Sequence, residues 1–262
     1  MSMNPSGYEE MALFLIESEV GKREVERFTK RRPELTVEDG YRIQEALIAR
    51  KLEQGYRVIG PKMGLTSRAK MKQMNVEEPI YGFIFDYMVV EGDVLRLDEL
   101  IHPKVEAEIA FVLAADVQGP GVTAAQVLAA TEYVVPALEI IDSRYEDFQF
   151  ALPDVVADNA SSSRVFIGSG FRSPVGLELD LIGVTLSING EWKDAGAGAE
   201  VLGHPAESVA MLANMLSRRG QSLKAGQVIL SGGITGAHTL KAGDTVTAIW
   251  DRLGTMQFRV QG

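Results

Sequence analysis

The segment His102-Pro103-Lys104-Val105-Glu106-Ala107-Glu108-Ile109-Ala110-Phe111 alternates apolar and polar side chains over much of its length. This alternation predicts a β-strand, because successive side chains of a strand point to opposite faces of a sheet. Glu106 and Glu108 then share one face, about 7 Å apart along the strand. Two carboxylates this close repel each other unless a cation or a proton lies between them. The alternative interpretation is a strand whose acidic face points to solvent.

A third carboxylate stands inside the apolar run Val134-Val135-Pro136-Ala137-Leu138-Glu139-Ile140-Ile141. Such a run predicts a buried strand, and a buried carboxylate needs a metal, an arginine or a proton as its partner. Arg144 offers a purely structural partner for Glu139. If Glu139 instead points towards Glu106 and Glu108, three hard oxygen ligands converge. Such a site suits Mg²⁺ or Mn²⁺, with positions left for water or substrate, and does not suit Zn²⁺.

Two further polar features adjoin apolar segments. Lys62 lies in Val58-Ile59-Gly60-Pro61-Lys62-Met63-Gly64, and a lysine at a strand end can hold an anionic substrate or serve as an acid or base. An ordinary surface lysine is the alternative. The run Asp158-Asn159-Ala160-Ser161-Ser162-Ser163-Arg164 is rich in hydrogen-bond donors, as a substrate-binding loop would be. Its alternative is a solvated loop.

The distribution of apolar residues predicts helices first and strands later. In the first 55 residues, Ser6 and Glu9 resemble a capping box. Thr36 with Asp39 opens a second helix, and an apolar stripe at helical spacing follows them. From residue 56 onward short β-like runs dominate, Asn189-Gly190 is a strong hairpin signal, and one clear helix lies near residues 205–218. We therefore expect an α+β fold in a single domain, residues 1–262, with a helical cap over residues 1–55 and a β-rich core over residues 56–262.

Composition excludes several classes of function. The 262 residues carry a formal net charge of −10, which disfavours binding to nucleic-acid phosphates and to anionic membranes, so neither is expected as a partner. Cysteine is absent, which excludes disulfides, thiolate catalysis and cysteine-ligated metals and suits the cytoplasm, where we expect the protein. The sequence also lacks a complete Gly-x-Gly-x-x-Gly motif, a P-loop and a Gly-x-Ser-x-Gly elbow, so nucleotide cofactors and α/β-hydrolase chemistry are unsupported.

Five ordered motifs resemble those of the fumarylacetoacetate hydrolase superfamily, most of all its branch of hydratases and decarboxylases from catechol meta-cleavage pathways. The resemblance extends from about residue 36 to the C-terminus. The motifs are Gly64-Leu65-Thr66-Ser67, Pro103-Lys104-Val105-Glu106-Ala107-Glu108, Glu139-Ile140-Ile141-Asp142-Ser143-Arg144, Ala157-Asp158-Asn159-Ala160-Ser161-Ser162 and Gly196-Ala197-Gly198…Leu202-Gly203-His204-Pro205.

This resemblance implies a mixed β-sheet roll with a divalent metal at its mouth, usually Mg²⁺, with Mn²⁺ as the alternative and no organic cofactor. It carries the role of metal ligand onto Glu106, Glu108 and Glu139, and that of the family's lysine onto Lys62. The further candidates come from the same motifs and their neighbours. They are Asp142, Arg144 and Asp158 for catalysis, and Thr66, Ser161, Arg164 and Gly233 for substrate contact.

Within the branch, the segments Pro79-Ile80-Tyr81-Gly82-Phe83 and Ser231-Gly232-Gly233-Ile234-Thr235 are more similar to the decarboxylases. The resemblance therefore implies decarboxylation of a 2-oxo dicarboxylic acid, 2-oxo-3-hexenedioate, to 2-hydroxypenta-2,4-dienoate and CO₂. The electrons left by the departing carboxylate would delocalise onto the 2-keto oxygen, where a metal serves as Lewis acid.

Two alternatives remain within the resemblance. One is a hydratase that adds water to 2-hydroxypenta-2,4-dienoate on the same metal scaffold, and the other is a non-catalytic subunit that stabilises such a hydratase. The resemblance also implies a homo-oligomer and a complex with the hydratase of the pathway.

Overall fold

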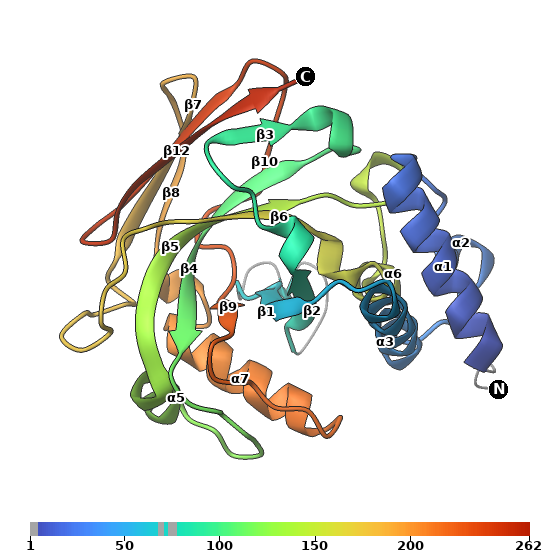
Figure 1. Ribbon diagram of the computed structural model, residues 1–262, viewed down its shortest axis with the longest axis horizontal. Helices are drawn as coiled ribbons and strands as arrows, with labels where there is room; N and C mark the ends of the chain where they lie inside the picture. Colours follow the sequence, from blue (N-terminus) through green and yellow to red (C-terminus); the bar gives the residue numbers. More distant parts are fainter. Residues whose placement is uncertain (1–4, 68–70, 73–77) are drawn as a thin grey trace.

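The computed structural model describes residues 5–67, 71–72 and 78–262, and its N-terminal helices lie to one side of two sheets (Figure 1). These helices are α1 (Pro5–Gly21), α2 (Phe28–Arg31) and α3 (Val37–Glu53). The helix start predicted at Thr36 is confirmed, and a capping box begins α3. The Thr36 side chain accepts a hydrogen bond from the Asp39 N–H, and the Asp39 carboxylate accepts one from the Thr36 N–H.

The larger sheet is mixed and carries the segment with which the sequence analysis began. Its strand order is β2 (Ile80–Phe85), β1 (Val58–Gly64), β9 (Val228–Leu230), β4 (Lys104–Leu113), β5 (Thr131–Ile141) and β6 (Ser162–Ile167), and β10 (His238–Thr239) pairs with β4. Strands β1 and β9 run parallel, whereas β4 and β5 are antiparallel. Because Glu108 is buried and Glu106 is half-buried, the interpretation that these glutamates point to solvent is wrong.

The smaller sheet packs against one face of the larger one. Its order is β3 (Val94–Arg96), β12 (Gly254–Gln261), β11 (Thr245–Trp250), β7 (Gly183–Ile188) and β8 (Glu191–Ala197). The hairpin predicted at Asn189-Gly190 joins β7 to β8. Both turn residues have positive φ, +56° and +76°, as a tight turn between twisted strands requires.

The two faces of β4 differ as the alternation predicts. Its apolar face, which carries Val105, Ala107, Ile109 and Phe111, belongs to a core shared with the smaller sheet, including Leu186, Val246 and Trp250. The opposite face carries Glu106 and Glu108. The predicted helix after residue 205 is α7 (Pro205–Ser217), which packs against α5 (Ala124–Ala130).

The N-terminal helices pack on the β-rich part through a second apolar cluster. Leu15 of α1 and Ile43 and Leu47 of α3 join Tyr145 and Ala157 in it. The helix that receives α3 is α6 (Leu152–Ala157). The buried Gln44 amide donates to the carbonyl oxygens of Tyr81 and Val156, at 2.9 and 3.0 Å. The expected α+β fold with an N-terminal helical cap is therefore confirmed.

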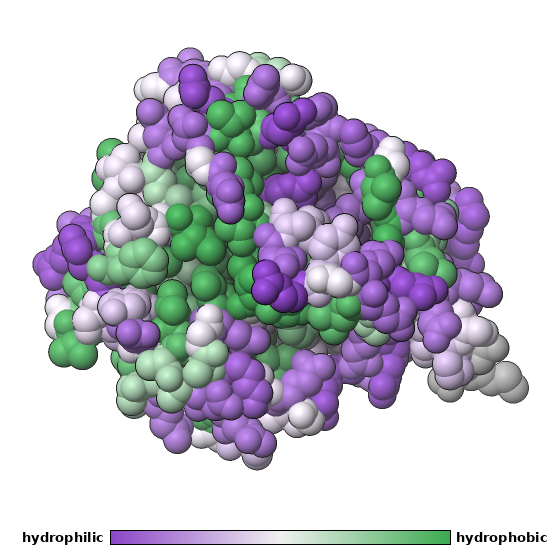
Figure 2. Space-filling view, viewed as in Figure 1, coloured by the Kyte–Doolittle hydropathy of each residue, from purple (hydrophilic) through white to green (hydrophobic). Residues whose placement is uncertain are grey.

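Polar and apolar residues are unevenly distributed over the face of the molecule that is drawn in Figure 2. Figure 2 shows apolar residues gathered over the middle of the molecule, with hydrophilic residues around them. Within the described ranges, no helix has both the length and the hydrophobicity needed to cross a membrane.

Candidate metal centre

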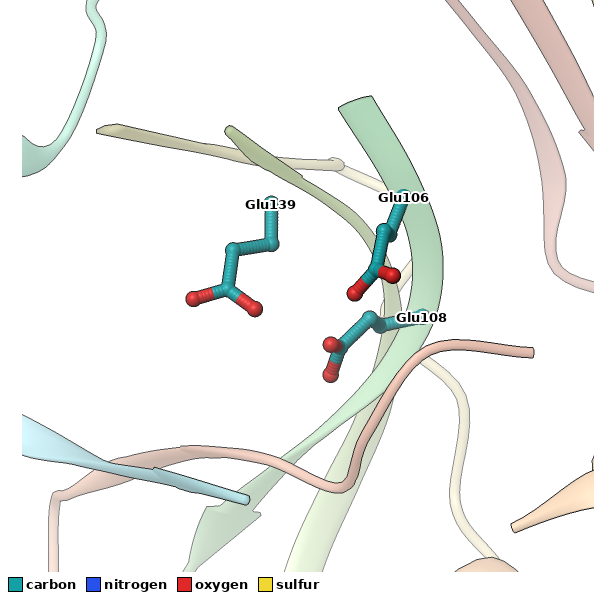
Figure 3. A group of neighbouring side chains, drawn as sticks. All are labelled: Glu106, Glu108 and Glu139. Carbon is teal, nitrogen blue, oxygen red and sulfur yellow. The ribbon is translucent and has the colours of Figure 1, made fainter. Parts of the chain in front are cut away.

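Three glutamate side chains from two adjacent strands point into one space. Glu106 and Glu108 project from β4, and Glu139 stands directly opposite Glu106 on the antiparallel neighbour β5 (Figure 3). One carboxylate oxygen can be chosen from each so that all three lie within 4.8 Å of one another. The strand period places the first pair on one face, and the register of β4 with β5 adds the third.

Two of these carboxylates, those of Glu108 and Glu139, each have an oxygen that is poorly compensated. Glu108 and Glu139 are buried, and the Oε1 atom of each has no hydrogen-bond partner among the described residues. Burial raises the pKa of Glu108 well above its usual range, and the negative charges of Glu139 and Glu106 raise it further. Burial also raises the pKa of Glu139, although Lys62 opposes this. Unsatisfied buried carboxylate oxygens fit a hard divalent cation such as Mg²⁺ or Mn²⁺.

Lys62 is the cation that the structure places beside this group. It lies on β1 with a buried side chain, and its Nζ is 3.1 Å from Glu139 Oε1. The contact is an ion pair without the alignment of a hydrogen bond, since Glu139 Oε1 remains unsatisfied. The alternative of a surface lysine is therefore wrong, and so is the pairing of Glu139 with Arg144.

The loop after β9 forms one wall of the site. The Gly232 N–H donates to Glu108 Oε2 at 2.8 Å. A Cβ atom on Gly233 would lie 2.9 Å from Glu106 Oε2, and one on Gly232, whose φ is +119°, would lie 2.2 Å from Thr66 Oγ1. Only glycines allow this backbone to approach the carboxylates so closely. The structure thus brings Thr66 and Gly233 to the same wall.

The smaller sheet contacts β4 on the side opposite the glutamate side chains. The indole Nε1–H of Trp250 on β11 donates to the backbone oxygen of Glu108 at 3.0 Å. Sequence reasoning missed Trp250 and also the Gly232 N–H. The consecutive glycines at 232 and 233 were the available signal for the Gly232 N–H, whereas no local sequence pattern indicates the role of Trp250.

Asp142, Arg144 and Asp158 form a buried cluster of their own. The Arg144 guanidinium bonds to the Asp158 carboxylate and donates to the backbone oxygens of Asp158 and Asp142, both at 2.6 Å. The Asp142 carboxylate accepts the N–H groups of Ile101 and His102, both at 2.8 Å. Burial raises the pKa of Asp158 to about 6, against the opposing effect of Arg144. Their contacts hold the end of β5 and the loop after α6.

The last two candidates lie in different surroundings. Ser161 is buried, and its Oγ has no hydrogen-bond partner among the described residues. Arg164 pairs with Ile140, so it points to the opposite face of the sheet from Glu139, which pairs with Val165. Its guanidinium bonds to Glu99 at 3.2 Å and lies 5.9 Å from the centre of the Tyr87 ring. The structure does not group Arg164 with the three glutamates.

The chain belongs to the fumarylacetoacetate hydrolase family, because the family model described as "Fumarylacetoacetate (FAA) hydrolase C-terminal" matches residues 57–261. The resemblance inferred from the motifs is therefore confirmed. Among curated relatives, the 4-oxalocrotonate decarboxylase of Pseudomonas sp. (strain CF600) is 49% identical, with 92% of each chain covered. The 2-hydroxyhexa-2,4-dienoate hydratase of Comamonas testosteroni is 44% identical, with 87% of each chain covered.

A solved structure extends this similarity to three dimensions. The 4-oxalocrotonate decarboxylase from Pseudomonas putida G7, complexed with magnesium and adipate, superimposes with a TM-score of 0.96. It is 44% identical, and the match covers 99% of both chains. The fold is thus shared over nearly the full length.

Proposed function

We propose that this protein catalyses the metal-dependent decarboxylation of 2-oxo-3-hexenedioate (4-oxalocrotonate) to 2-hydroxypenta-2,4-dienoate and CO₂, in the meta-cleavage catabolism of aromatic compounds. The observation that carries the proposal is the group of three converging carboxylates with Lys62 beside it. The decarboxylase relative of strain CF600, 49% identical over 243 residues, supports the reaction. The magnesium and adipate of the solved relative support a divalent cation and a dicarboxylate ligand.

Glu106, Glu108 and Glu139 are the residues that would hold Mg²⁺, with Mn²⁺ as the alternative. When bound, the cation would supply a Lewis acid at the 2-oxo end of the substrate. The chain's own contribution is to prepare the ligands. The Gly232 N–H and the Trp250 indole fix Glu108 through its carboxylate and its backbone, so that little reorganisation is needed on binding.

Lys62 would orient the 2-oxo acid end of the substrate or move the proton of the dienol product. Its buried ammonium lies 3.1 Å from Glu139 Oε1, next to the carboxylate group. An ammonium in this position can bind a substrate oxygen and can also exchange a proton. Thr66 and Gly233 would contact the substrate from the wall formed by the loop after β9.

Ser161 is a further substrate contact in this proposal. Asn159, Ala160 and Ser161 all have positive φ, between +51° and +56°. Such strain in residues other than glycine tends to cluster at functional sites. The buried Ser161 hydroxyl without a partner leaves hydrogen-bonding capacity for a ligand. Arg164 stays a predicted substrate contact. Asp142, Arg144 and Asp158, which the sequence analysis gives as catalytic candidates, would act as positioning residues that hold the end of β5.

The hydratase reaction is the second candidate, favoured by the 44% identity to the Comamonas hydratase. A non-catalytic subunit for such a hydratase is a weaker alternative, because the glutamates and Lys62 are all present. We also propose a cytoplasmic homo-oligomer that associates with the pathway hydratase. Residues 1–55 and 56–262 would form one domain, since Leu15 and Leu47 share a cluster with Tyr145.

The test is CO₂ release from 2-oxo-3-hexenedioate by protein stripped with a chelator and then given Mg²⁺. We expect release that depends on the metal. Metal-dependent consumption of 2-hydroxypenta-2,4-dienoate without CO₂ release would keep the site and assign the hydratase reaction. No turnover of either substrate would refute the enzymatic proposal and favour the non-catalytic subunit.

A further inference from the structure

The loop over residues 231–237 is attached to the strand that carries Glu106 and Glu108. Ser231 Oγ donates to the Ile109 oxygen at 2.7 Å, and the Ile234 N–H donates to the Ala107 oxygen at 2.8 Å. Thr235 Oγ1 accepts the Ala107 N–H at 3.0 Å. The loop therefore contacts Ala107 and Ile109, and these positions alternate along β4 with Glu106 and Glu108. A shift of this loop would therefore also shift the backbone that carries Glu106 and Glu108.

The far end of this loop is held from the other sheet. The Gly236 N–H donates to Asp194 Oδ2 at 2.7 Å. Asp194 lies on β8, and its Oδ1 accepts the Ala195 N–H at 2.8 Å, which orients the carboxylate towards the loop. His238 Nε2 lies 3.5 Å from the same Oδ2 atom. Asp194 thus bridges the smaller sheet to the segment that passes beside Glu108 in Figure 3.

Close packing leaves the loop little room to move towards β8. A Cβ atom on Gly196 would lie 2.5 Å from the Ile234 oxygen, and one on Gly236 would lie 3.2 Å from Asp194 Oδ2. The backbone of β8 and the backbone of the loop are therefore in contact. In this setting the charge-assisted hydrogen bond that the Asp194 carboxylate accepts from the Gly236 N–H fixes the position of the loop.

We propose that Asp194 is a positioning residue for the metal centre, which acts through the Gly236 N–H to keep the Gly232 N–H on Glu108 and the loop backbone against Glu106. This inference rests on the proposed metal site, but not on the identity of the substrate. Groups that hydrogen-bond to a metal ligand, as the Gly232 N–H does to Glu108, typically change metal affinity or activity by about 10- to 100-fold when they are lost. Among the described residues, Asp194 makes no direct contact with the side chain of Glu106 or Glu108.

The experiment compares Asp194→Ala and Asp194→Asn with the wild-type full chain. Asp251→Ala is the matched control, because Asp251 is an exposed aspartate in the turn between β11 and β12 of the same sheet and pairs with Arg252. Calorimetric titration of the chelator-stripped protein with Mn²⁺ gives the dissociation constant, and CO₂ release gives kcat and KM. All measurements are made on folded protein, well below each variant's unfolding temperature.

We expect Asp194→Ala to weaken Mn²⁺ binding by about tenfold or more. Asp194→Asn keeps an acceptor for the Gly236 N–H without the charge, so it should lose only about threefold, since charge-assisted bonds are roughly twice as strong as neutral ones. The Asp251→Ala control should match the wild type. Wild-type Mn²⁺ affinity in folded Asp194→Ala would overturn the inference, even if its stability fell.

Should Asp194→Ala fail to fold, Asp194→Asn decides alone, and an unchanged dissociation constant in that variant overturns the inference. A wild-type protein that binds Mn²⁺ without releasing CO₂ would refute the proposed reaction, and Mn²⁺ affinity would still test Asp194. A wild-type protein that binds no Mn²⁺ would overturn both the metal site and the role of Asp194.

Discussion

Two clusters of charged groups in this molecule contain similar side chains but differ in the balance of positive and negative charge. In the cap cluster, formed by Glu19, Lys51 and Tyr87, the Lys51 ammonium lies 2.6 Å from Glu19 Oε2, and the Tyr87 hydroxyl donates to Glu19 Oε1 at 2.7 Å. Burial acts to raise the pKa of Glu19, but Lys51 and the hydrogen bonds leave it lowered. Each charge and each carboxylate oxygen has a partner.

The metal cluster, formed by Glu106, Glu108, Glu139 and Lys62, has three carboxylates and one ammonium. The pKa values of Glu108 and Glu139 are raised, mainly by burial. Buried carboxylate oxygens without a partner, such as the Oε1 atoms of Glu108 and Glu139, are costly unless a cation binds them, whereas a cluster in which every charge is paired does not need one. The difference teaches that charge balance, rather than burial alone, distinguishes a ligand site from a structural contact.

The largest effect is expected from Glu106→Gln in the metal cluster. The substitution removes one anionic ligand while preserving shape, so metal-dependent turnover should fall by roughly 10³-fold, about 4 kcal/mol of transition-state stabilisation. The control is Glu19→Gln, which should keep turnover within about twofold. CO₂ release at saturating Mg²⁺ is the measurement. Undiminished release by Glu106→Gln would remove Glu106 from the ligand set.

The next effect concerns the one cation of the metal cluster. Lys62→Ala should lower turnover by about 10²-fold, because a buried acid–base or substrate-orienting group is lost. Metal affinity should be kept, since removing a positive charge beside Glu139 does not weaken an anionic site. Titration with Mg²⁺ and a rate assay separate the two. A rate near that of the wild type would rule out a catalytic role for Lys62.

A stability effect without an activity effect is expected in the cap cluster. Lys51→Met leaves the Glu19 carboxylate without its cation and should lower the free energy of unfolding by about 3 kcal/mol. Turnover per folded molecule should not change. Urea unfolding monitored by tryptophan fluorescence gives the first quantity. If stability stayed equal to that of the wild type, the cap cluster would not be the structural counterpart described above.

The smallest effect is the opposite pH dependence of the two clusters in metal-free protein. Raised folded-state pKa values make Glu108 and Glu139 oppose folding as the pH rises from about 4.3 through those values. The lowered pKa of Glu19 has the opposite sign, because its stabilisation is present above about pH 4.3 and is lost as the pH falls through the folded-state value.

Thermal unfolding in chelator tests this sign. Glu108→Gln should gain stability relative to the wild type as the pH rises, by up to about 1.4 kcal/mol per pH unit within the titration range. Glu19→Gln should lose stability relative to the wild type in a lower window, as the pH rises from the lowered folded-state pKa of Glu19 to about 4.3, and the difference should stay constant above it. Added Mg²⁺ should abolish the advantage of Glu108→Gln. Parallel stability curves for all three proteins would contradict the raised pKa of Glu108.

Much of the fold was predictable because its signals are local. The helix start at Thr36 and the hairpin at Asn189-Gly190 each depend on a few neighbouring residues. The orientation of Arg164 could not be predicted from such local signals. Its direction relative to Glu139 depends on how β6 pairs with β5, and a polar run beside a site motif does not reveal that pairing.

The partners of Arg144 show the same limit. The sequence shows an arginine near Glu139, but the structure pairs Arg144 with Asp158 and assigns Lys62 to Glu139. Asp194 and Trp250 carried no sequence signal, because each is linked from the other sheet by a hydrogen bond to a distant residue, Asp194 to Gly236 of the loop after β9 and Trp250 to the backbone of Glu108.

The alternation of residues 104–111 was enough to place Glu106 and Glu108 on one face, because the two-residue period is a property of any strand. The facing position of Glu139, the approach of Lys62 and the Gly232 N–H came only from the assembled sheets. Gly232 is 124 positions from Glu108 along the chain. Contacts over such separations arise from the pairing and packing of whole strands, which no local spacing encodes.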